Sequence, residues 1–313
     1  MKILIMGTGG VGGYYGGLLA QQGNEVTFIA RGAHLYAIRH EGLTVKSVHG
    51  DFKVFPVNAT DDPAKVEPVD LVLFSVKTYN TDESAEAIRP VLGPQTAVLS
   101  LQNGVDAGER IGRMIGGEHV IGGATWLSSA VEAPGVIKQI SQFRRIVLGE
   151  LGGGRSERIQ SIFEVLNQTG LTVEISENIQ KVLWTKFAFI SAVSSIGSLT
   201  RLPMGDYRSV PEARHLLSSI MQEVEALARA QGIALEADVV SRSLEFIDNS
   251  GPHIKPSMQL DVESGRRTEL DSMVGVIGRK GRELGVPTPA ADFVYGALLP
   301  VELKARNEYA PAS

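Results

Sequence analysis

Short runs of apolar residues alternate with helical or polar segments through the first half of the chain. The run ILIM at residues 3–6 is followed by a Gly-rich turn, a helix to about Gln22 and a second apolar run at Val26–Ala30. Runs of this length are typical of parallel strands that are buried on both faces of a sheet. Similar runs recur at Leu71–Val76, Ala97–Leu101 and Val120–Thr125. This alternation predicts an α/β fold with an N-terminal, Rossmann-like doubly wound sheet.

Further strands are expected beside this core. Leu43–Val48 and Phe52–Val57 are predicted to form a hairpin, because the three residues HGD that separate them suit a turn. Two separate strands are predicted at Val136–Ile140 and Arg145–Leu148, and a last one at Thr172–Ile175.

From Glu177 onward the apolar positions recur with a helical period. Helices are predicted over five segments, namely 177–200, 211–231, 236–249, 268–284 and 288–307. Gly232 and Gly285 directly follow two of these segments and are typical of helix ends. We therefore expect residues 1–174 to form an α/β domain and residues 175–313 to form an all-α C-terminal domain. The tail after Tyr309 is expected to fray.

The composition excludes several kinds of site. The chain has 313 residues, no cysteine and a formal net charge of -5. Without thiols there can be no disulfide scaffold, Cys-ligated zinc or thiol nucleophile, and the negative charge argues against a nucleic-acid partner. The six histidines show no metal-ligand spacing, so no metal site is predicted.

No membrane or secretory segment is predicted. The uncharged stretch after Lys2 is interrupted by many glycines, unlike the continuous apolar helix of a signal peptide. Residues 187–200 are too few to cross a bilayer, which takes about 20 residues, and they are interpreted as a buried helix. The expected location is the cytoplasm.

A motif of the form G-x-G-x-x-G follows the first predicted strand and opens the first predicted helix, which is the context of a dinucleotide site. It consists of Gly7, Thr8, Gly9, Gly10, Val11 and Gly12. Gly7 permits a tight turn, Gly9 lets the backbone approach a pyrophosphate, and Gly12 allows close packing of helix and strand. The free N–H groups at the helix start favour an anion. A merely flexible glycine-rich turn is the alternative.

The residue after the second strand distinguishes the two nicotinamide cofactors. NAD sites usually have Asp or Glu there, whereas this chain has Arg31 and no carboxylate until Glu41. A guanidinium suits the 2′-phosphate of NADPH, so NADPH/NADP is the predicted cofactor. A solvated loop arginine is the alternative.

Several other residues are candidates for contacts with cofactor or substrate. Lys77 and Asn103 follow two strands at the carboxyl edge of the sheet, where ligands bind, although such residues are often caps or surface groups. Lys186 has apolar helical neighbours, so its amine either extends to water or lies in a pocket that would lower its pKa. Glu269 lies in the first turn of a predicted helix, where the dipole stabilises a carboxylate with or without a function. Ser257 follows Pro256 and could be a simple helix cap.

Together these motifs resemble those of the ketopantoate reductase (2-dehydropantoate 2-reductase) family. The matching segments span nearly the whole chain and are MKILIMGTGGVGGYYG, Arg31, SVKTYN, LQNGV, LWTKF, RLPMGD and SMQLDVESGRRTELD. The resemblance implies a Rossmann domain followed by an all-helical domain. It also implies an oxidoreductase that reduces the 2-oxo group of ketopantoate with NADPH, giving pantoate for pantothenate biosynthesis.

The resemblance further implies roles for single residues. Lys186 matches the family's proton-donating lysine, Asn103 an asparagine that contacts cofactor and substrate, and Lys77 a lysine that contacts the cofactor. Glu269 matches a glutamate at the junction of cofactor and substrate, and Ser257 a substrate-binding serine. Lys186, Asn103 and Glu269 are thus the implied catalytic residues.

At three implied substrate-binding positions the chain departs from the family pattern. Ile190 and Ser194, one and two turns after Lys186, and Met204 stand where the family commonly has asparagines. An unpaired polar group costs about 1–3 kcal/mol, so a bulkier or more apolar 2-oxo acid would suit Ile190 and Met204 better. A reductase of such an acid is therefore one alternative. A related dehydrogenase of a 2- or 3-hydroxy acid and a non-catalytic NADP-binding or redox-sensing protein are the others. The expected partner is a small 2-oxo acid, and assembly into a homodimer is left open.

Overall fold

A computed structural model describes residues 1–308, and the chain forms two compact units. The first comprises Met1–Gln102 and Ala107–Val182, and the second comprises Asn103–Asp106 and the chain from Leu183 onward. The domain boundary expected between residues 174 and 175 remains a prediction. The expected fraying after Tyr309 concerns residues outside the described part of the chain.

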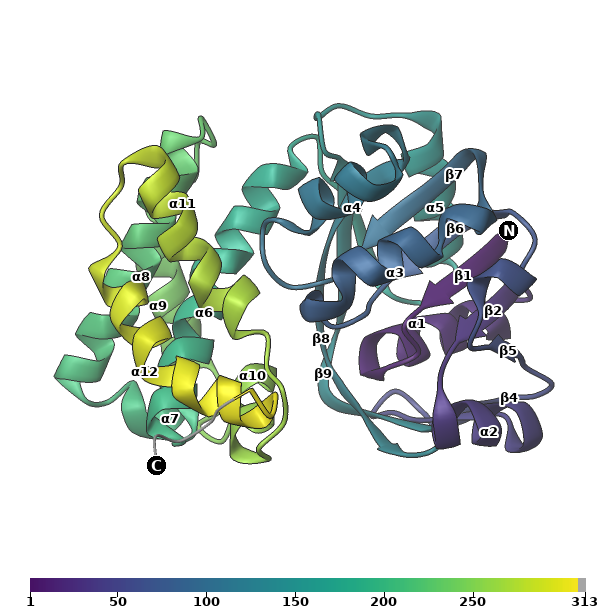
Figure 1. Ribbon diagram of the computed structural model, residues 1–313, viewed down its shortest axis with the longest axis horizontal. Helices are drawn as coiled ribbons and strands as arrows, with labels where there is room; N and C mark the ends of the chain where they lie inside the picture. Colours follow the sequence, from purple (N-terminus) through teal and green to yellow (C-terminus); the bar gives the residue numbers. More distant parts are fainter. Residues whose placement is uncertain (309–313) are drawn as a thin grey trace. The chain divides into compact units, whose positions relative to one another are not determined.

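The first unit contains a mixed sheet flanked by helices, and the predicted Rossmann-like class is confirmed (Figure 1). The strand order is β4-β3-β9-β8-β7-β6-β1-β2-β5, and β10 pairs with β9. The strands are β1 (Lys2–Met6), β2 (Glu25–Ile29), β3 (Leu43–Lys46), β4 (Phe52–Val54), β5 (Asn58–Thr60), β6 (Val69–Phe74), β7 (Leu92–Ser100), β8 (Val120–Ala133), β9 (Val136–Glu150) and β10 (Thr172–Ile175).

Six parallel neighbours, β5-β2-β1-β6-β7-β8, form the part of the sheet that positions the candidate nucleotide site. After β1 and β2 the chain forms β3 and β4 at the far end of the sheet, and it then returns to place β5 beside β2. The strands β6, β7 and β8 follow on the other side of β1. The strand order therefore reverses beside β1. In open α/β sheets, ligands bind at the carboxyl ends of the strands at such a switch point.

Successive residues of β1 point to opposite faces of the sheet, and each face is covered by helices. Ile3 and Ile5 belong to one apolar core with residues of α1, α2 and α5, whereas Leu4 and Met6 belong to a second core with residues of α3 and α4. These helices are α1 (Gly10–Gln21), α2 (Gly32–Glu41), α3 (Thr81–Ala87), α4 (Ala107–Ile115) and α5 (Glu157–Asn167), and the short 3-10 turns are η1 (Pro63–Lys65), η2 (Thr78–Asn80), η3 (Arg89–Val91) and η4 (Gly117–His119).

One strand prediction was wrong. The two strands predicted at Val136–Ile140 and Arg145–Leu148 are a single strand, β9, which pairs antiparallel with β8. The polar stretch that separated them in the sequence lies opposite an irregularity in register between Leu127 and Ser129. Such a bulge bends a strand without ending it, which is why the apolar pattern is broken there while the ladder continues. The predicted hairpin is confirmed as β3 and β4, and the three-residue β5 was not predicted.

The described part of the second unit is built from helices and contains no strand, which confirms the predicted all-α region. Its helices are α6 (Ile179–Thr200, which begins in the first unit), α7 (Met204–Tyr207), α8 (Pro211–Ala230), α9 (Val239–Asn249), α10 (Ser257–Glu263), α11 (Val276–Leu284) and α12 (Pro289–Ala305). A π-helical turn, Asp271–Gly275, directly precedes α11. All five predicted helices are present, whereas α7 and α10 were missed because they are only 4 and 7 residues long.

Helix α6 supplies much of the core of this unit. Its buried side chains include Trp184, Phe187 and Val193, which pack with residues of α8, α11 and α12. Within residues 1–308 it is the one helix long and apolar enough to cross a membrane, but most of it is buried, as is usual for a core helix.

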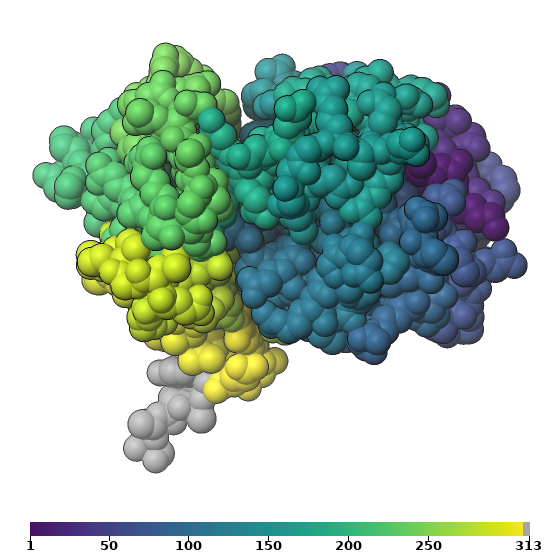
Figure 2. Space-filling view, turned by 90° about the horizontal axis from the view of Figure 1, so that it is seen from above, coloured from purple at the N-terminus to yellow at the C-terminus, as the bar shows by residue number. Residues whose placement is uncertain are grey.

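In the space-filling view, the yellow residues toward the end of the described chain lie at the surface (Figure 2).

Candidate functional site

The turn after β1 has a backbone that only glycine accommodates. Gly7 has a φ of +98°, in the region that favours glycine. A Cβ at Gly7 would also lie 2.8 Å from Val76 Cγ1 and 2.9 Å from the backbone nitrogen of Val76. The turn can therefore pass directly over the residues that follow β6 only because position 7 has no side chain.

The remaining glycines of the motif have different surroundings. A Cβ at Gly12 would lie 2.2 Å from the carbonyl oxygen of Gly7 and 2.8 Å from Ile5 Cγ2, and one at Gly10 would lie 2.3 Å from the carbonyl oxygen of Ser129. These two glycines permit close packing of α1. At Gly9, by contrast, no atom of the described residues lies within 4 Å of a Cβ position. The backbone at Gly9 is thus open to a ligand. Val11, in the first turn of α1, packs against the core.

Thr8 and His34 hold this turn from two sides. The backbone N–H and the hydroxyl of Thr8 both donate to the carbonyl oxygen of Ile29, at 3.0 and 2.8 Å. His34 Nε2 lies 2.9 Å from the carbonyl oxygen of Thr8, and the N–H of Gly135 donates to His34 Nδ1 at 3.0 Å. Because Nδ1 accepts, Nε2 carries the proton and donates to Thr8. Burial lowers the pKa of His34, although its bond to Thr8 raises it, so the neutral form is favoured.

His34 was not among the candidate residues, because single histidines are more often at the surface. It is instead half-buried and connects the Gly-rich turn to the β8–β9 turn. Its partner Gly135 is 101 positions away, so no local spacing could have revealed the contact.

Arg31 and Lys77 lie in the same unit as the Gly-rich turn. Arg31 is the N-cap residue of α2, and its Nη2 lies 3.5 Å from Glu83 Oε1, with both side chains 70% exposed. An exposed pair of this kind contributes about 0–1 kcal/mol, so it holds Arg31 only weakly. Lys77 is half-buried and precedes η2 at the carboxyl end of β6. Contacts of Arg31 and Lys77 with the nucleotide thus remain predictions.

The second unit brings together the three predicted catalytic residues. Lys186, half-buried on α6, donates from Nζ to Asn103 Oδ1 at 3.0 Å. Burial lowers the pKa of Lys186 from 10.5 to about 8, while the charge of Glu269 raises it. A lysine with such a pKa can act as a proton donor near neutral pH.

Glu269 lies at the start of the segment that leads into α11. It is buried, at 8% exposure, and its backbone carbonyl accepts from the N–H groups of Ser272 and Met273 at 3.1 and 2.9 Å. A Cβ at Gly104, next to Asn103, would lie 3.3 Å from the carbonyl oxygen of Ser272. The loop that carries Asn103 and the turn that follows Glu269 therefore pack against each other.

The predicted substrate-binding residues have mixed surroundings. Ile190 and Ser194 follow Lys186 at helical spacing on α6, so they share its face, and Ser194 is 2% exposed. Met204 is also 2% exposed and belongs to the core of the unit. Ser257 is exposed as the first residue of α10. Within residues 1–308, no group of three or more His, Asp or Glu side chains could hold a metal ion.

Two family models match the chain. Residues 3–153 match the model described as ketopantoate reductase PanE/ApbA, and residues 178–302 match the model of the C-terminal part of that family.

Curated relatives match over nearly their full length. The uncharacterized oxidoreductase YkpB of Bacillus subtilis (strain 168) is 30% identical over 298 residues, which cover 95% of this chain and 98% of the relative. A 2-dehydropantoate 2-reductase of Mesorhizobium japonicum is 31% identical over 315 residues, which cover 94% and 95%.

Solved structures match the chain equally completely. A PanE/ApbA family ketopantoate reductase from Ralstonia eutropha JMP134 has a TM-score of 0.90 at 32% identity and covers 98% of this chain and 100% of its own. A D-mandelate dehydrogenase, solved with NADH and anilino(oxo)acetate, has a TM-score of 0.89 at 26% identity and covers 98% and 99%.

Proposed function

Because the chain belongs to the ketopantoate reductase PanE/ApbA family of oxidoreductases, we propose that it reduces the 2-oxo group of a 2-oxo acid with NADPH. Ketopantoate is the leading substrate, since relatives across the family carry the name 2-dehydropantoate 2-reductase. The observation that carries the proposal is the hydrogen bond from Lys186 to Asn103, with Glu269 acting on the same amine.

The switch point of the sheet fits a dinucleotide. Gly9 leaves its backbone open, and α1 begins without a side-chain cap, so the N–H groups of its first turn suit the pyrophosphate. We propose that Arg31 pairs with the 2′-phosphate of NADPH in place of Glu83, because a phosphate offers a guanidinium more charge than one carboxylate does. Lys77 would contact the same cofactor, and so would Asn103 and Glu269.

The residues of the second unit supply the acid and its orientation. When bound, the reduced nicotinamide supplies a hydride to the carbonyl carbon. Lys186, as an ammonium ion, hydrogen-bonds the carbonyl oxygen and gives it a proton as the C=O π bond breaks; the amine then regains a proton from water. Asn103 holds the ammonium through Oδ1, so its amide N–H can stabilise the negative charge that develops on the oxygen. Glu269 favours the protonated lysine.

The residues beside Lys186 bear on the choice of acid. Ile190 offers an apolar surface one turn after Lys186, where the family pattern has an amide, so a 2-oxo acid with a more apolar side chain is the second candidate substrate. The structural relative solved with anilino(oxo)acetate supports this second candidate. Ser257 would bind the substrate carboxylate or side chain in either case.

The decisive test is turnover by the Lys186→Ala variant, followed by the absorbance of NADPH. We expect the rate constant to fall by about 10²–10⁴-fold, as for loss of a general acid, while NADPH still binds. The exposed lysine variant Lys65→Ala is the control and keeps the wild-type rate. Unchanged turnover in Lys186→Ala would show that the acid is another group.

A panel of 2-oxo acids separates the two substrate candidates. Ketopantoate and acids with aliphatic or aromatic side chains are compared by kcat/KM with NADPH. A preference for ketopantoate supports the first candidate, and a preference for an apolar acid supports the second. Absence of turnover with every acid, despite NADPH binding, would instead favour a non-catalytic binding protein.

We also propose a cytoplasmic location. Sedimentation of the purified protein tests whether it forms a homodimer.

A further inference from the structure

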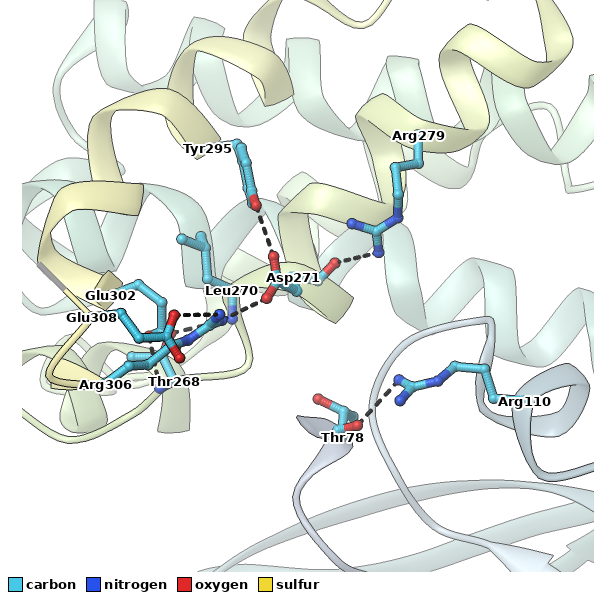
Figure 3. Close-up of polar contacts among 10 residues, drawn as sticks. All are labelled: Thr78, Arg110, Thr268, Leu270, Asp271, Arg279, Tyr295, Glu302, Arg306 and Glu308. Carbon is cyan, nitrogen blue, oxygen red and sulfur yellow. Dashed lines mark hydrogen bonds and ion pairs between the residues drawn. The ribbon is translucent and has the colours of Figure 1, made fainter. Parts of the chain in front are cut away.

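The segment that carries Glu269 is attached to helix α12 on both sides of that residue. Figure 3 shows Thr268 and Asp271 within this segment, and Glu302 and Arg306 from the end of α12 pointing toward them. Glu302 and Arg306 follow Thr268 and Asp271 by more than 30 positions in the chain. None of the four residues was predicted from the sequence to belong to the site.

Glu302 fixes the residue before Glu269. The backbone N–H of Thr268 donates to Glu302 Oε2 at 2.8 Å, and the Thr268 hydroxyl donates to the same oxygen at 2.5 Å. The hydroxyl also accepts from the N–H of Leu270 at 3.2 Å. Backbone groups on either side of Glu269 are thereby tied to one carboxylate, whose side chain is 1% exposed.

Arg306 fixes the residues after Glu269. Its Nε donates to Glu302 Oε1 at 2.6 Å, and its Nη2 donates to Asp271 Oδ2 at 2.5 Å. Tyr295 on α12 donates its hydroxyl to Asp271 Oδ1 at 2.8 Å. Burial raises the pKa of Asp271, but the hydrogen bonds from Arg306 and Tyr295 outweigh it and keep that pKa low. The Asp271 carboxylate is therefore fully charged at neutral pH.

The ion pairs of Arg306 with Glu302 and Asp271 are not needed for stability alone. A buried ion pair carries a large desolvation penalty, so replacing it by apolar residues is often neutral for stability. Here the Glu302 carboxylate, 1% exposed, and the Arg306 guanidinium, on a side chain 15% exposed, contact residues on either side of Glu269, and one of these is the half-exposed Asp271. The π-helical turn begins at Asp271, and such turns occur frequently at functional sites.

We infer that Glu302 and Arg306 are positioning residues, which hold residues 268–271 so that the Glu269 carboxylate stays beside the Lys186 amine. The inference rests on the proposed function, because it assigns these two residues to the orientation of the proton donor. Glu302 holds the first residue of this segment, Thr268, and Arg306 holds its last residue, Asp271.

The consequence is a change in the proton affinity of Lys186 when the network is broken. The charge of Glu269 raises the pKa of Lys186 against the effect of burial. If the segment moves, that attraction weakens and the pKa falls below about 8. At a fixed pH above its pKa, a fall of about one pH unit removes about nine-tenths of the protonated lysine.

The test uses Glu302→Gln and the milder Tyr295→Phe, which keeps every charge in place. The control is Arg214→Gln, because Arg214 forms an ion pair with Asp248 on the exposed surface of the same unit. The pKa of Lys186 is measured directly by NMR titration of ¹³C-labelled lysine, with Lys186→Ala for assignment. The basic limb of kcat against pH is then measured with NADPH in excess.

For Glu302→Gln we expect the Lys186 titration and the basic limb of kcat to move together by about one pH unit toward acid, and for Tyr295→Phe by less. The Arg214→Gln variant titrates like the wild type. An unchanged Lys186 titration in folded Tyr295→Phe and Glu302→Gln would overturn the inference. The titration needs no turnover. If the wild-type protein reduces no 2-oxo acid but the two variants still shift the Lys186 titration, the proposed function is refuted and the positioning role stands.

Discussion

Replacing Lys186 by methionine removes the charge while keeping a chain of similar length in the same place. The pKa of the lysine is about 8 in the folded protein and 10.5 for an ordinary lysine. Between these two values the unfolded chain binds more protons than the folded one. The free energy of unfolding of the wild type therefore rises with pH through this window, and the methionine variant lacks that rise.

The size of the effect follows from the two pKa values. The difference between 10.5 and about 8 corresponds to about 3.4 kcal/mol at pH values below both. About 2 kcal/mol of this is recovered between pH 7 and pH 9.5, because the folded lysine loses its proton over this range while the unfolded one keeps most of its charge. Because the side chain is only half-buried, solvent screening reduces the expected change to about 1–2 kcal/mol.

The assay is urea unfolding of wild type and Lys186→Met at pH 7 and at pH 9.5, followed by circular dichroism. The lost hydrogen bond to Asn103 costs the variant about 1 kcal/mol at every pH and cancels from the comparison. We expect the wild type to gain about 1–2 kcal/mol on the variant as the pH rises. A constant difference between the two proteins would refute the idea that this amine is held in a medium that disfavours its charge.

Two further predictions concern the nucleotide site. Arg31→Ala should weaken NADPH binding by about 1.5–3 kcal/mol, the value of a charged hydrogen bond, and leave the affinity for NADH nearly unchanged. Both affinities are measured by fluorescence titration, with Arg39→Ala on the adjoining helix as the control. Equal losses of affinity for both cofactors would contradict the NADPH assignment. Gly12→Ala should destabilise the protein by about 1–3 kcal/mol in urea unfolding, because its Cβ meets backbone at 2.2 Å, whereas Gly9→Ala should keep full stability and bind dinucleotide less well. A stable Gly12→Ala would refute the packing role.

The sequence predicted those features that depend on near neighbours along the chain. The Gly-rich turn could be interpreted because the strand before it and the helix after it are contiguous with it, and Gly7, Gly9 and Gly12 occupy surroundings that match their expected roles. The wrong prediction, two strands in place of β9, arose where pairing with β8 overrode a local polar stretch.

The site in the second unit could be predicted only in part. The apolar neighbours of Lys186 left open whether its amine reached water, and its partner Asn103 is 83 positions away. The resemblance to a family assigned both residues to one site, but the hydrogen bond between them comes from the structure alone. Neither source pointed to Glu302 or Arg306, whose side chains resemble ordinary helix-surface charges until the fold places Thr268 and Asp271 against them.

The choice of substrate rests on fewer residues than the sequence suggested. Three positions lack the family's amides, yet Met204 and Ser194 are each 2% exposed, and Met204 packs in the core of its unit. A side chain enclosed in this way bears on the stability of the helices more than on a ligand. Ile190, half-buried one turn after Lys186, is the position where an apolar side chain follows the proposed proton donor on the same helix. An apolar substrate preference must therefore arise mainly from Ile190.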